Sequence, residues 1–226
     1  MGKSQIVAMG GMGAEGGSLF SFFTGLAAKS EPRVCLIPTA SADSLDHTLA
    51  FYELCRECGA VPAHLTLFNR RVSDLRAFLL AQDAVFVGGG NTASMLAVWR
   101  AHGVDTVLRE AWAEGIVLGG PSAGANCWFE ASITDSFGPG LAGLQDGLGL
   151  LSGSFCPHYD GEVQRRPTYT RLIAEGFTPG YAADDGVGMH FRDGELAEVV
   201  SARPGATAYL VGRGGENPLD ARALRA

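Results

Sequence analysis

Residues 116–126 read Ile-Val-Leu-Gly-Gly-Pro-Ser-Ala-Gly-Ala-Asn, and this stretch decides the fold. Its apolar start, residues 116–118, predicts a short buried strand. Gly120, Ser122 and Gly124 then fill the pattern G-x-S-x-G, which is typical of a strand that turns sharply into a helix with a serine at the apex. Small residues suit such a turn because its backbone is crowded and partly strained. The serine is either a nucleophile or, in the plainer interpretation, the cap of a helix after a glycine-rich loop.

Strands and helices alternate on the N-terminal side of this stretch. The predicted strands are residues 5–9, 33–37, 64–68 and 84–87, and the predicted helices are residues 18–29, 44–58, 72–80, 93–102 and 104–114. This alternation favours an α/β fold with a mostly parallel sheet and helices on both faces. The glycine-rich loops after Met9, Val87 and Leu118 then share the carboxyl edge of the sheet, where ligands bind in such folds.

The second half of the chain has shorter elements. We predict a strand over residues 154–160 that ends at a histidine, a helix over residues 168–175, and short strands over residues 181–186, 187–191, 196–201 and 208–211. The polar tail from Gly212 onward is expected to be frayed. Because the sequence contains neither a linker nor an internal repeat, we expect one domain over residues 1–226.

Composition excludes several classes of protein. The chain has 226 residues, 46% hydrophobic and 18% charged, and a net charge of −7 without a basic tract, so nucleic acid is not the expected main partner. We expect no membrane span and, because the first residues lead directly into a strand, a cytoplasmic location. Cys55 and Cys58 form a lone C-x-x-C inside a helical pattern, which favours packed thiols over a metal or redox site.

The first glycine-rich loop contains the pattern G-x-G-x-x-G at Gly11, Gly13 and Gly16. This pattern after a strand is also the fingerprint of a dinucleotide site. The acidic residue expected about twenty positions later is missing, so a tight loop bordering a cleft is the favoured interpretation.

A nucleophilic serine needs a base, and the base needs an acceptor that fixes its tautomer. Among five histidines, His158 alone follows Ser122 at the end of a strand, which makes it the candidate base rather than a half-buried structural histidine. For the acid we favour Asp135, with Glu130 second, because both follow the serine closely. Any carboxylate within reach of the imidazole would serve, so other residues remain open: Asp160, Asp184 and Asp185.

An oxyanion hole requires two free amides. The amide of Ala123, directly after the serine, offers one, and the loop Gly88–Gly90 on the same sheet edge offers the other. The alternative for this loop is a phosphate cradle, but the G-K-[ST] ending of such a loop is missing.

Three segments together resemble the peptidase E (aspartyl dipeptidase) family, whose relatives include cyanophycinase. They are Val-Gly-Gly-Gly-Asn-Thr at 87–92, Ser-Ala-Gly-Ala-Asn at 122–126 and Pro-His-Tyr at 157–159, and the resemblance extends over residues 5–211. It implies a flavodoxin-like α/β fold related to class I glutamine amidotransferases. It also implies a serine peptidase, without metal or cofactor, that cleaves short peptides after an N-terminal residue, aspartate in the best-known members. A homodimer is a further expectation of the family.

Carried over by position, the resemblance makes Ser122 the nucleophile and His158 the base, with Gly90 and Ala123 as the oxyanion amides. Asp135 falls near the family's acidic residue, two positions closer to the serine.

Members of the family bind the aspartyl side chain of the substrate with an arginine that lies after the histidine and before a helix. Arg166, or its neighbour Arg165, occupies that place, and Asn91 is expected to contact substrate as well. Pro121 stands where dipeptidase E has an aromatic residue, so strict aspartyl specificity does not follow. Other interpretations stay open: an esterase, amidase or cyanophycinase-type hydrolase, or a non-catalytic α/β module that binds a ligand.

Overall fold

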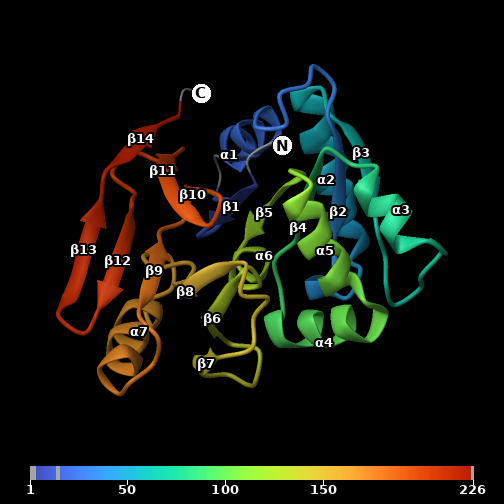
Figure 1. Ribbon diagram of the computed structural model, residues 1–226. Coiled ribbons are helices and arrows are strands. Elements are labelled where there is room, and N and C mark those ends of the chain that lie inside the picture. Colours follow the sequence, from blue (N-terminus) through green and yellow to red (C-terminus); the bar gives the residue numbers. More distant parts are fainter. Residues whose placement is uncertain (1–3, 14–15, 225–226) are drawn as a thin grey trace.

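The computed structural model describes residues 4–13 and 16–224, and the strands within these ranges form two sheets (Figure 1). The eight-stranded sheet comprises, in spatial order, β14 (Ala221–Ala223), β11 (Glu195–Ser201), β10 (Val187–Arg192), β1 (Gln5–Met9), β5 (Val117–Pro121), β4 (Ala84–Val87), β2 (Arg33–Ile37) and β3 (Val61–His64). The six-stranded sheet comprises β13 (Gly215–Leu219), β12 (Ala208–Gly212), β9 (Gly180–Ala183), β8 (Leu151–Cys156), β6 (Phe129–Thr134) and β7 (Ala142–Leu144).

The helices lie between the strands in the chain. They are α1 (Gly16–Gly25), a short 3-10 turn at Thr39–Ser41, α2 (Leu45–Cys58), α3 (Leu75–Leu80), α4 (Thr92–His102), α5 (Val104–Ala113), α6 (Ala123–Asn126) and α7 (Arg165–Ala174). Helix α2 begins where predicted because the side chain of Ser44 accepts a hydrogen bond from the amide of His47. In the part of the chain that the structure describes, no helix is both long enough and apolar enough to cross a membrane.

Strands β1, β5, β4, β2 and β3 run parallel and are covered on both faces. On one face, Phe20 of α1 and Phe51 of α2 pack against Phe86 of β4, with ring centroids 5.2 and 6.1 Å from it. On the opposite face, helices α3 to α5 cover the sheet, and Trp99 of α4 is fully buried in that core. Fully burying one such large apolar side chain contributes about 1.5–3 kcal/mol, so these two layers fix the sheet edge that carries the glycine-rich loops.

The α/β class predicted from the alternation is therefore confirmed. The parallel strands follow the order β3-β2-β4-β5-β1, which differs from the 2-1-3-4-5 order of flavodoxin. Strand β10 adds to this sheet antiparallel to β1, and the second sheet was not anticipated at all.

Two predicted elements were wrong. The strand expected at residues 64–68 ends at His64, because the amides of Leu67 and Phe68 donate to the carboxylate of Asp43 instead of a neighbouring strand. The tail after Gly212 is not frayed: β13 pairs with β12 along its whole length, and β14 adds to the edge of the larger sheet beside β11.

The C-x-x-C thiols are packed against the rest of α2 and its neighbours. Cys55 is fully buried, and Cys58 is partly buried and packs against the same hydrophobic core. Burial, with a smaller contribution from Cys58, raises the pKa of the Cys55 thiol to about 12, so this thiol stays protonated and unreactive at neutral pH.

Candidate active site

Ser122 stands directly after β5, at the sharp turn that the sequence predicts. Its backbone has φ 55° and ψ −115°, a strained conformation for a residue other than glycine. The amide of Ser122 donates to the carbonyl of Met9 at 3.1 Å, and its own carbonyl accepts from Ala125 and Asn126. These hydrogen bonds hold the strained backbone in place.

The glycines on either side of the serine are required by close packing. A Cβ atom on Gly120 or on Gly124 would lie 2.1 Å from the carbonyl oxygen of Val87. The fixed letters of the G-x-S-x-G pattern therefore have a steric origin in the neighbouring strand β4.

His158 lies in the loop after β8 and reaches the same place from the other sheet. Its backbone also has a positive φ, 52°, and its amide donates to the carbonyl of Gly10 at 3.2 Å. The side chains of His158 and Ser122 line one cavity of about 390 Å³. No hydrogen bond joins these two side chains in the structure. Such catalytic hydrogen bonds are often long without substrate and tighten when it binds.

The carboxylate that holds His158 belongs to Asp185, in the connection between β9 and β10. Its Oδ1 lies 2.7 Å from Nδ1 of the imidazole. A Cβ atom on Gly11 or Gly161 would lie 2.0 or 2.1 Å from the oxygens of this carboxylate, so the two glycines enclose it.

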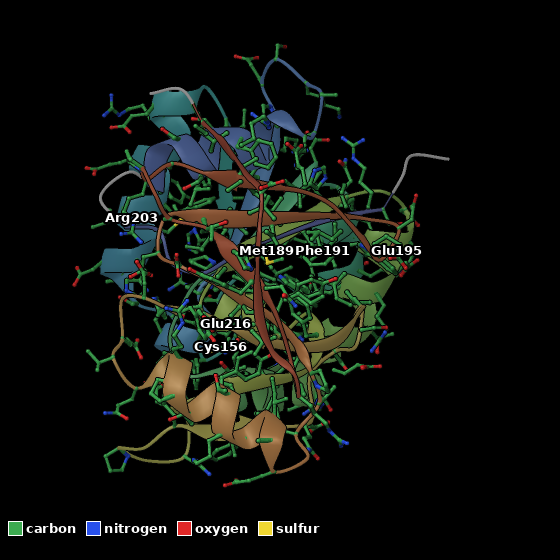
Figure 2. The ribbon with its side chains drawn as sticks, turned by 90° about the vertical axis from the view of Figure 1, so that its left-hand side faces the viewer. Cys156, Met189, Phe191, Glu195, Arg203 and Glu216 are labelled. Carbon is green, nitrogen blue, oxygen red and sulfur yellow. The ribbon has the colours of Figure 1, made fainter. Side chains whose placement is uncertain are left out.

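The backbone of Asp185 is fixed from both sides. Its amide donates to Oδ1 of Asp160 at 2.9 Å, and its carbonyl accepts from Nε of Arg203 at 3.0 Å. Asp160 and Arg203, the latter labelled in Figure 2, also form an ion pair with each other. Asp160 is thus a support for Asp185 and does not itself reach the imidazole.

The favoured acid, Asp135, is placed elsewhere. It follows β6 and lines a second, polar cavity that Ser122 also lines, together with Gly90, Asn91, Glu162 and Arg165. The prediction that Asp135 orients His158 does not match this geometry, because the imidazole is bound to a carboxylate from the junction of the two sheets.

The remaining carboxylates are engaged away from His158. Glu130 lies on β6 and accepts a hydrogen bond from the amide of Gly153. Asp184 is buried and accepts from the amide of Thr207. Burial raises the pKa of this carboxyl above its ordinary value.

The two proposed oxyanion amides flank the serine. Ala123 opens α6, and Gly90, with φ 135°, ends the loop after β4. Within the described ranges, neither amide has a hydrogen-bond partner. In the same loop, a Cβ atom on Gly89 would lie 3.5 Å from the Cβ of Ser122.

The two neighbouring arginines at the start of α7 have different surroundings. Arg166 forms an ion pair with Glu216, a residue labelled in Figure 2, and its guanidinium carbon lies 4.7 Å from the ring centroids of Tyr159 and Tyr209. The ion pair connects α7 to the β12–β13 hairpin, and Arg166 lines neither of the two cavities that Ser122 lines.

Arg165 is the arginine that lines the polar cavity. The sequence names Arg166, or its neighbour Arg165, as the arginine that contacts substrate. The structure places Arg165 at the cavity and Arg166 outside it, because consecutive helical residues point about 100° apart. Arg165 is buried, and its Nε donates to Glu162 at 2.7 Å while Nη1 donates to the carbonyl of Ile133 at 3.0 Å. Burial alone would raise the pKa of Glu162, but the hydrogen bond and charge of Arg165 outweigh it and hold that pKa below its usual value.

Asn91 also lines the polar cavity, but both ends of its side chain are used internally. Oδ1 accepts from the amide of Ser94 and so caps α4, and Nδ2 donates to the carbonyl of Ser136. Asn91 therefore shapes the cavity wall by joining α4 to the loop after β6.

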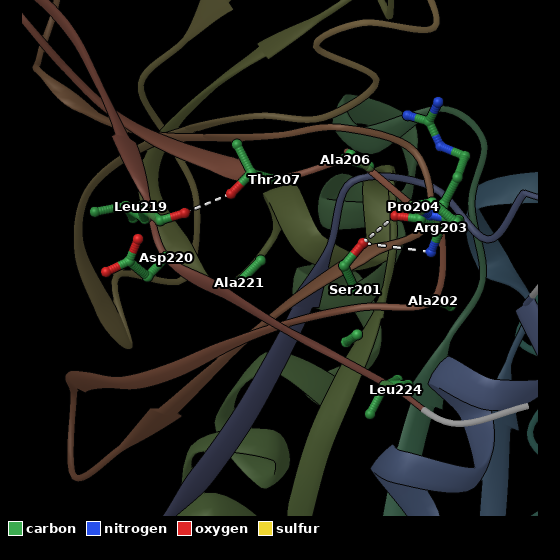
Figure 3. Close-up of a pocket in the computed structure, with 12 residues that line it drawn as sticks. Ser201, Ala202, Arg203, Pro204, Ala206, Thr207, Leu219, Asp220, Ala221 and Leu224 are labelled. Atoms are coloured by element: carbon green, nitrogen blue, oxygen red, sulfur yellow. Dashed lines mark hydrogen bonds between the residues drawn. The ribbon is translucent and has the colours of Figure 1, made fainter.

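A further cavity lies between the end of β11, the loop that follows it and the C-terminal residues 219–224 (Figure 3). Its hydroxyl groups serve the backbone: Ser201 donates to the carbonyl of Arg203, and Thr207 donates to that of Leu219. Neither Ser122 nor His158 lines it, so it is separate from the site described above.

Comparisons with known proteins identify the relatives of this chain. The family model of peptidase family S51 matches residues 6–199. Over 212 residues, the chain is 48% identical to the uncharacterized peptidase YgaJ of Bacillus subtilis, covering 92% of this chain and 91% of that protein. It is also 30% identical to peptidase E of Shewanella denitrificans over 149 residues, which are 62% of each chain.

Two solved structures share the fold. One, described as a putative peptidase E protein from Listeria monocytogenes, has a TM-score of 0.67 and 20% identity, over 86% of this chain and 97% of that one. The other, a peptidase from an acI-B1 actinobacterium, has a TM-score of 0.71 and 16% identity, over 97% of this chain and 95% of that one. Since the family model covers most of the chain and a relative is nearly half identical along its length, this protein belongs to peptidase family S51 and is a serine peptidase.

Proposed function

We propose that this peptidase is an exopeptidase of the peptidase E type, which releases the N-terminal residue of short peptides through Ser122, His158 and Asp185. One observation carries the proposal: His158 shares a cavity with the strained serine while its other side is held by a carboxylate at 2.7 Å. This is the order of groups that activates a serine hydroxyl.

In the first half of the reaction, Oγ of Ser122 attacks the carbonyl carbon of the scissile bond, and its proton passes to Nε2 of His158. Asp185 holds the Nδ1 proton and stabilises the imidazolium that forms. When the tetrahedral intermediate collapses, the carbon–nitrogen bond breaks and His158 gives its proton to the leaving nitrogen. The N-terminal residue is now an ester on Ser122.

In the second half, a water molecule attacks the ester carbon through its oxygen, and His158 takes a proton from this water. The carbon–oxygen bond to Ser122 then breaks, and His158 returns the proton to the serine. The free amides of Ala123 and of Gly90 are the proposed donors to the oxyanion in both intermediates, because backbone amides aimed at that oxygen contribute about 2.7–4 kcal/mol each.

The polar cavity, with a volume of about 240 Å³, is the proposed site of the N-terminal residue. Arg165 offers a cation to an acidic side chain, and the carboxylates of Asp135 and Glu162 suit the free α-ammonium group. An N-terminal aspartate carries both groups, the negative side-chain carboxylate and the positive α-ammonium group. Because Glu162 already pairs with Arg165, we expect a preference for aspartate rather than an absolute requirement.

The direct test replaces Ser122 with alanine and measures the hydrolysis of a dipeptide library varied at its first residue. We expect turnover to fall to the background rate, with an unchanged circular dichroism spectrum. A fluorophosphonate probe should label the original protein and not the variant. Unchanged turnover in the alanine variant would refute the assignment of the nucleophile.

A matched pair of variants tests the cavity for the first residue. Arg165→Lys should lower kcat/KM for Asp-Leu more than for Ala-Leu, by about tenfold or more, because lysine cannot reproduce the bidentate fork. Arg166→Lys changes the neighbouring residue outside the cavity, and the ratio of the two substrates should stay the same. Equal ratios in both variants would show that Arg165 does not read the first side chain.

A further inference from the structure

The cavity on the His158 side of the serine differs from the polar one in chemistry and size. Buried aromatic and aliphatic side chains line it: Leu36, Phe51 and Phe86. Met12, Ala50 and Leu54 also contribute to its walls. Apart from two histidines, none of the residues lining this cavity is ionisable.

The mechanism decides which part of a peptide enters each cavity. His158 must hand its proton to the leaving nitrogen, so this nitrogen departs on the side of the imidazole. Ser122 lines both cavities, but His158 lines only the apolar one, while Gly90 lines only the polar one. The acyl part of the substrate therefore belongs on the polar side and the leaving residue on the apolar side.

We propose that the apolar cavity binds the side chain of the residue that follows the scissile bond, and that it selects large apolar side chains such as leucine and phenylalanine. This inference rests on the proposed exopeptidase activity. The cavity volume of about 390 Å³ falls within the range of about 300–1,000 Å³ that is typical of small-ligand sites, and its walls offer apolar contact instead of fixed charge.

The preference has a kinetic signature. The leaving residue occupies the cavity only until the ester on Ser122 forms, and all peptides with the same first residue give the same ester. The identity of the second residue should therefore change kcat/KM, which reports ester formation. It should not change the rate at which the isolated ester is hydrolysed.

The first experiment compares dipeptides that share their first residue and end in glycine, leucine, phenylalanine or lysine. Burying an additional apolar side chain should raise kcat/KM for the leucine and phenylalanine peptides about ten- to hundredfold over the glycine peptide. The lysine peptide should remain close to the glycine peptide.

The second experiment introduces a negative charge into the wall of the apolar cavity. Ala50 lies on α2 at the cavity, and Ala50→Glu places a carboxylate there without disturbing a buried position. We expect this variant to lose the preference for leucine and to favour the lysine peptide. Leu49→Glu is the matched control, because Leu49 is the preceding residue on the same helix, is 65% exposed and does not line the cavity.

Each outcome separates the inference from the activity on which it rests. Equal kcat/KM values for the glycine and leucine peptides would overturn the inference and leave the exopeptidase intact. The same would follow if Ala50→Glu and Leu49→Glu shifted the ratios alike. If none of the dipeptides were cleaved, both the activity and the inference would fail.

Discussion

Replacing Asp185 with asparagine tests the central geometric claim about the site. Oδ1 of Asp185 accepts the Nδ1 proton of His158, which leaves the lone pair of Nε2 free to take the proton of the serine. Asparagine can turn its amide group toward Nδ1 and donate to it. This favours the opposite tautomer, in which Nε2 carries the proton and cannot act as a base.

The size of the effect follows from how firmly the carboxylate is held. In serine peptidases with this arrangement, asparagine in place of the acid lowers kcat about 10⁴-fold. Here the enclosing Gly11 and Gly161 prevent the new side chain from moving away. However, 31% of the Asp185 side chain and 23% of the His158 side chain are exposed, so water can replace part of the interaction. We therefore expect a loss of roughly 10³-fold, equivalent to about 4 kcal/mol in activation free energy.

The assay is steady-state hydrolysis of the best dipeptide substrate, with circular dichroism as the check on folding. Asp135→Asn is the control variant, because Asp135 is an exposed carboxylate of the polar cavity without contact to the imidazole. Its effect should stay below about tenfold and fall mainly on KM, as expected for a residue that binds substrate.

The opposite pattern would refute the reasoning. If Asp135→Asn abolished kcat while Asp185→Asn remained within tenfold of the original enzyme, the acid would be Asp135. The 2.7 Å contact between His158 and Asp185 would then be structural.

Two further predictions concern the packing around Asp185 and the dependence of the free energy of unfolding on acidic pH. Gly11→Ala would place a Cβ atom 2.0 Å from the Asp185 carboxylate, so we expect kcat/KM to fall about 100-fold. The control is Gly25→Ala, whose Cβ atom would meet nothing within 4 Å and should leave kcat/KM unchanged. Equal activities of the two variants in a dipeptide assay would contradict this prediction. His190 is fully buried, and its burial, reinforced by nearby Arg192, lowers its pKa, so the unfolded chain binds the proton more readily. The free energy of unfolding should therefore be unaffected by this group well above its ordinary pKa of about 6.5 and fall as the pH drops below that value. His190→Gln should flatten the decline between pH 7 and 5 in urea titrations, and parallel curves for the two proteins would disprove the role of this histidine.

The sharp turn that carries Ser122, the proposed nucleophile, could be predicted from sequence because the features that define it are local. Gly120 and Gly124 are within two residues of Ser122, and the same strand-turn-helix unit supplies the amide of Ala123. Likewise the helices and, apart from β3, the parallel strands before residue 122 follow from hydrophobic patterns and caps within each segment. Local rules of this kind carry over directly from a sequence to a structure.

The carboxylate that contacts His158 could not be found in the same way. Asp185 is 27 residues from His158 in the chain, and it approaches the imidazole only because β9 belongs to one sheet and β10 to the other. The sequence suggested Asp135 because of its short distance along the chain from the serine. The structure places Arg165 and not Arg166 at the polar cavity, and which of two consecutive helical side chains faces a cavity depends on how α7 packs, which the local sequence does not specify.

The junction of the two sheets also explains why His158, the proposed base, is held in a fixed position. Ser122 follows β5 in the larger sheet, whereas His158 follows β8 in the smaller one. The amide of His158 donates to Gly10 at the end of β1, and the next amide, of Tyr159, donates to Ala183 at the end of β9. The loop of the base is therefore tied to both sheets at once, and any change that shifts one sheet against the other must move the imidazole relative to the serine.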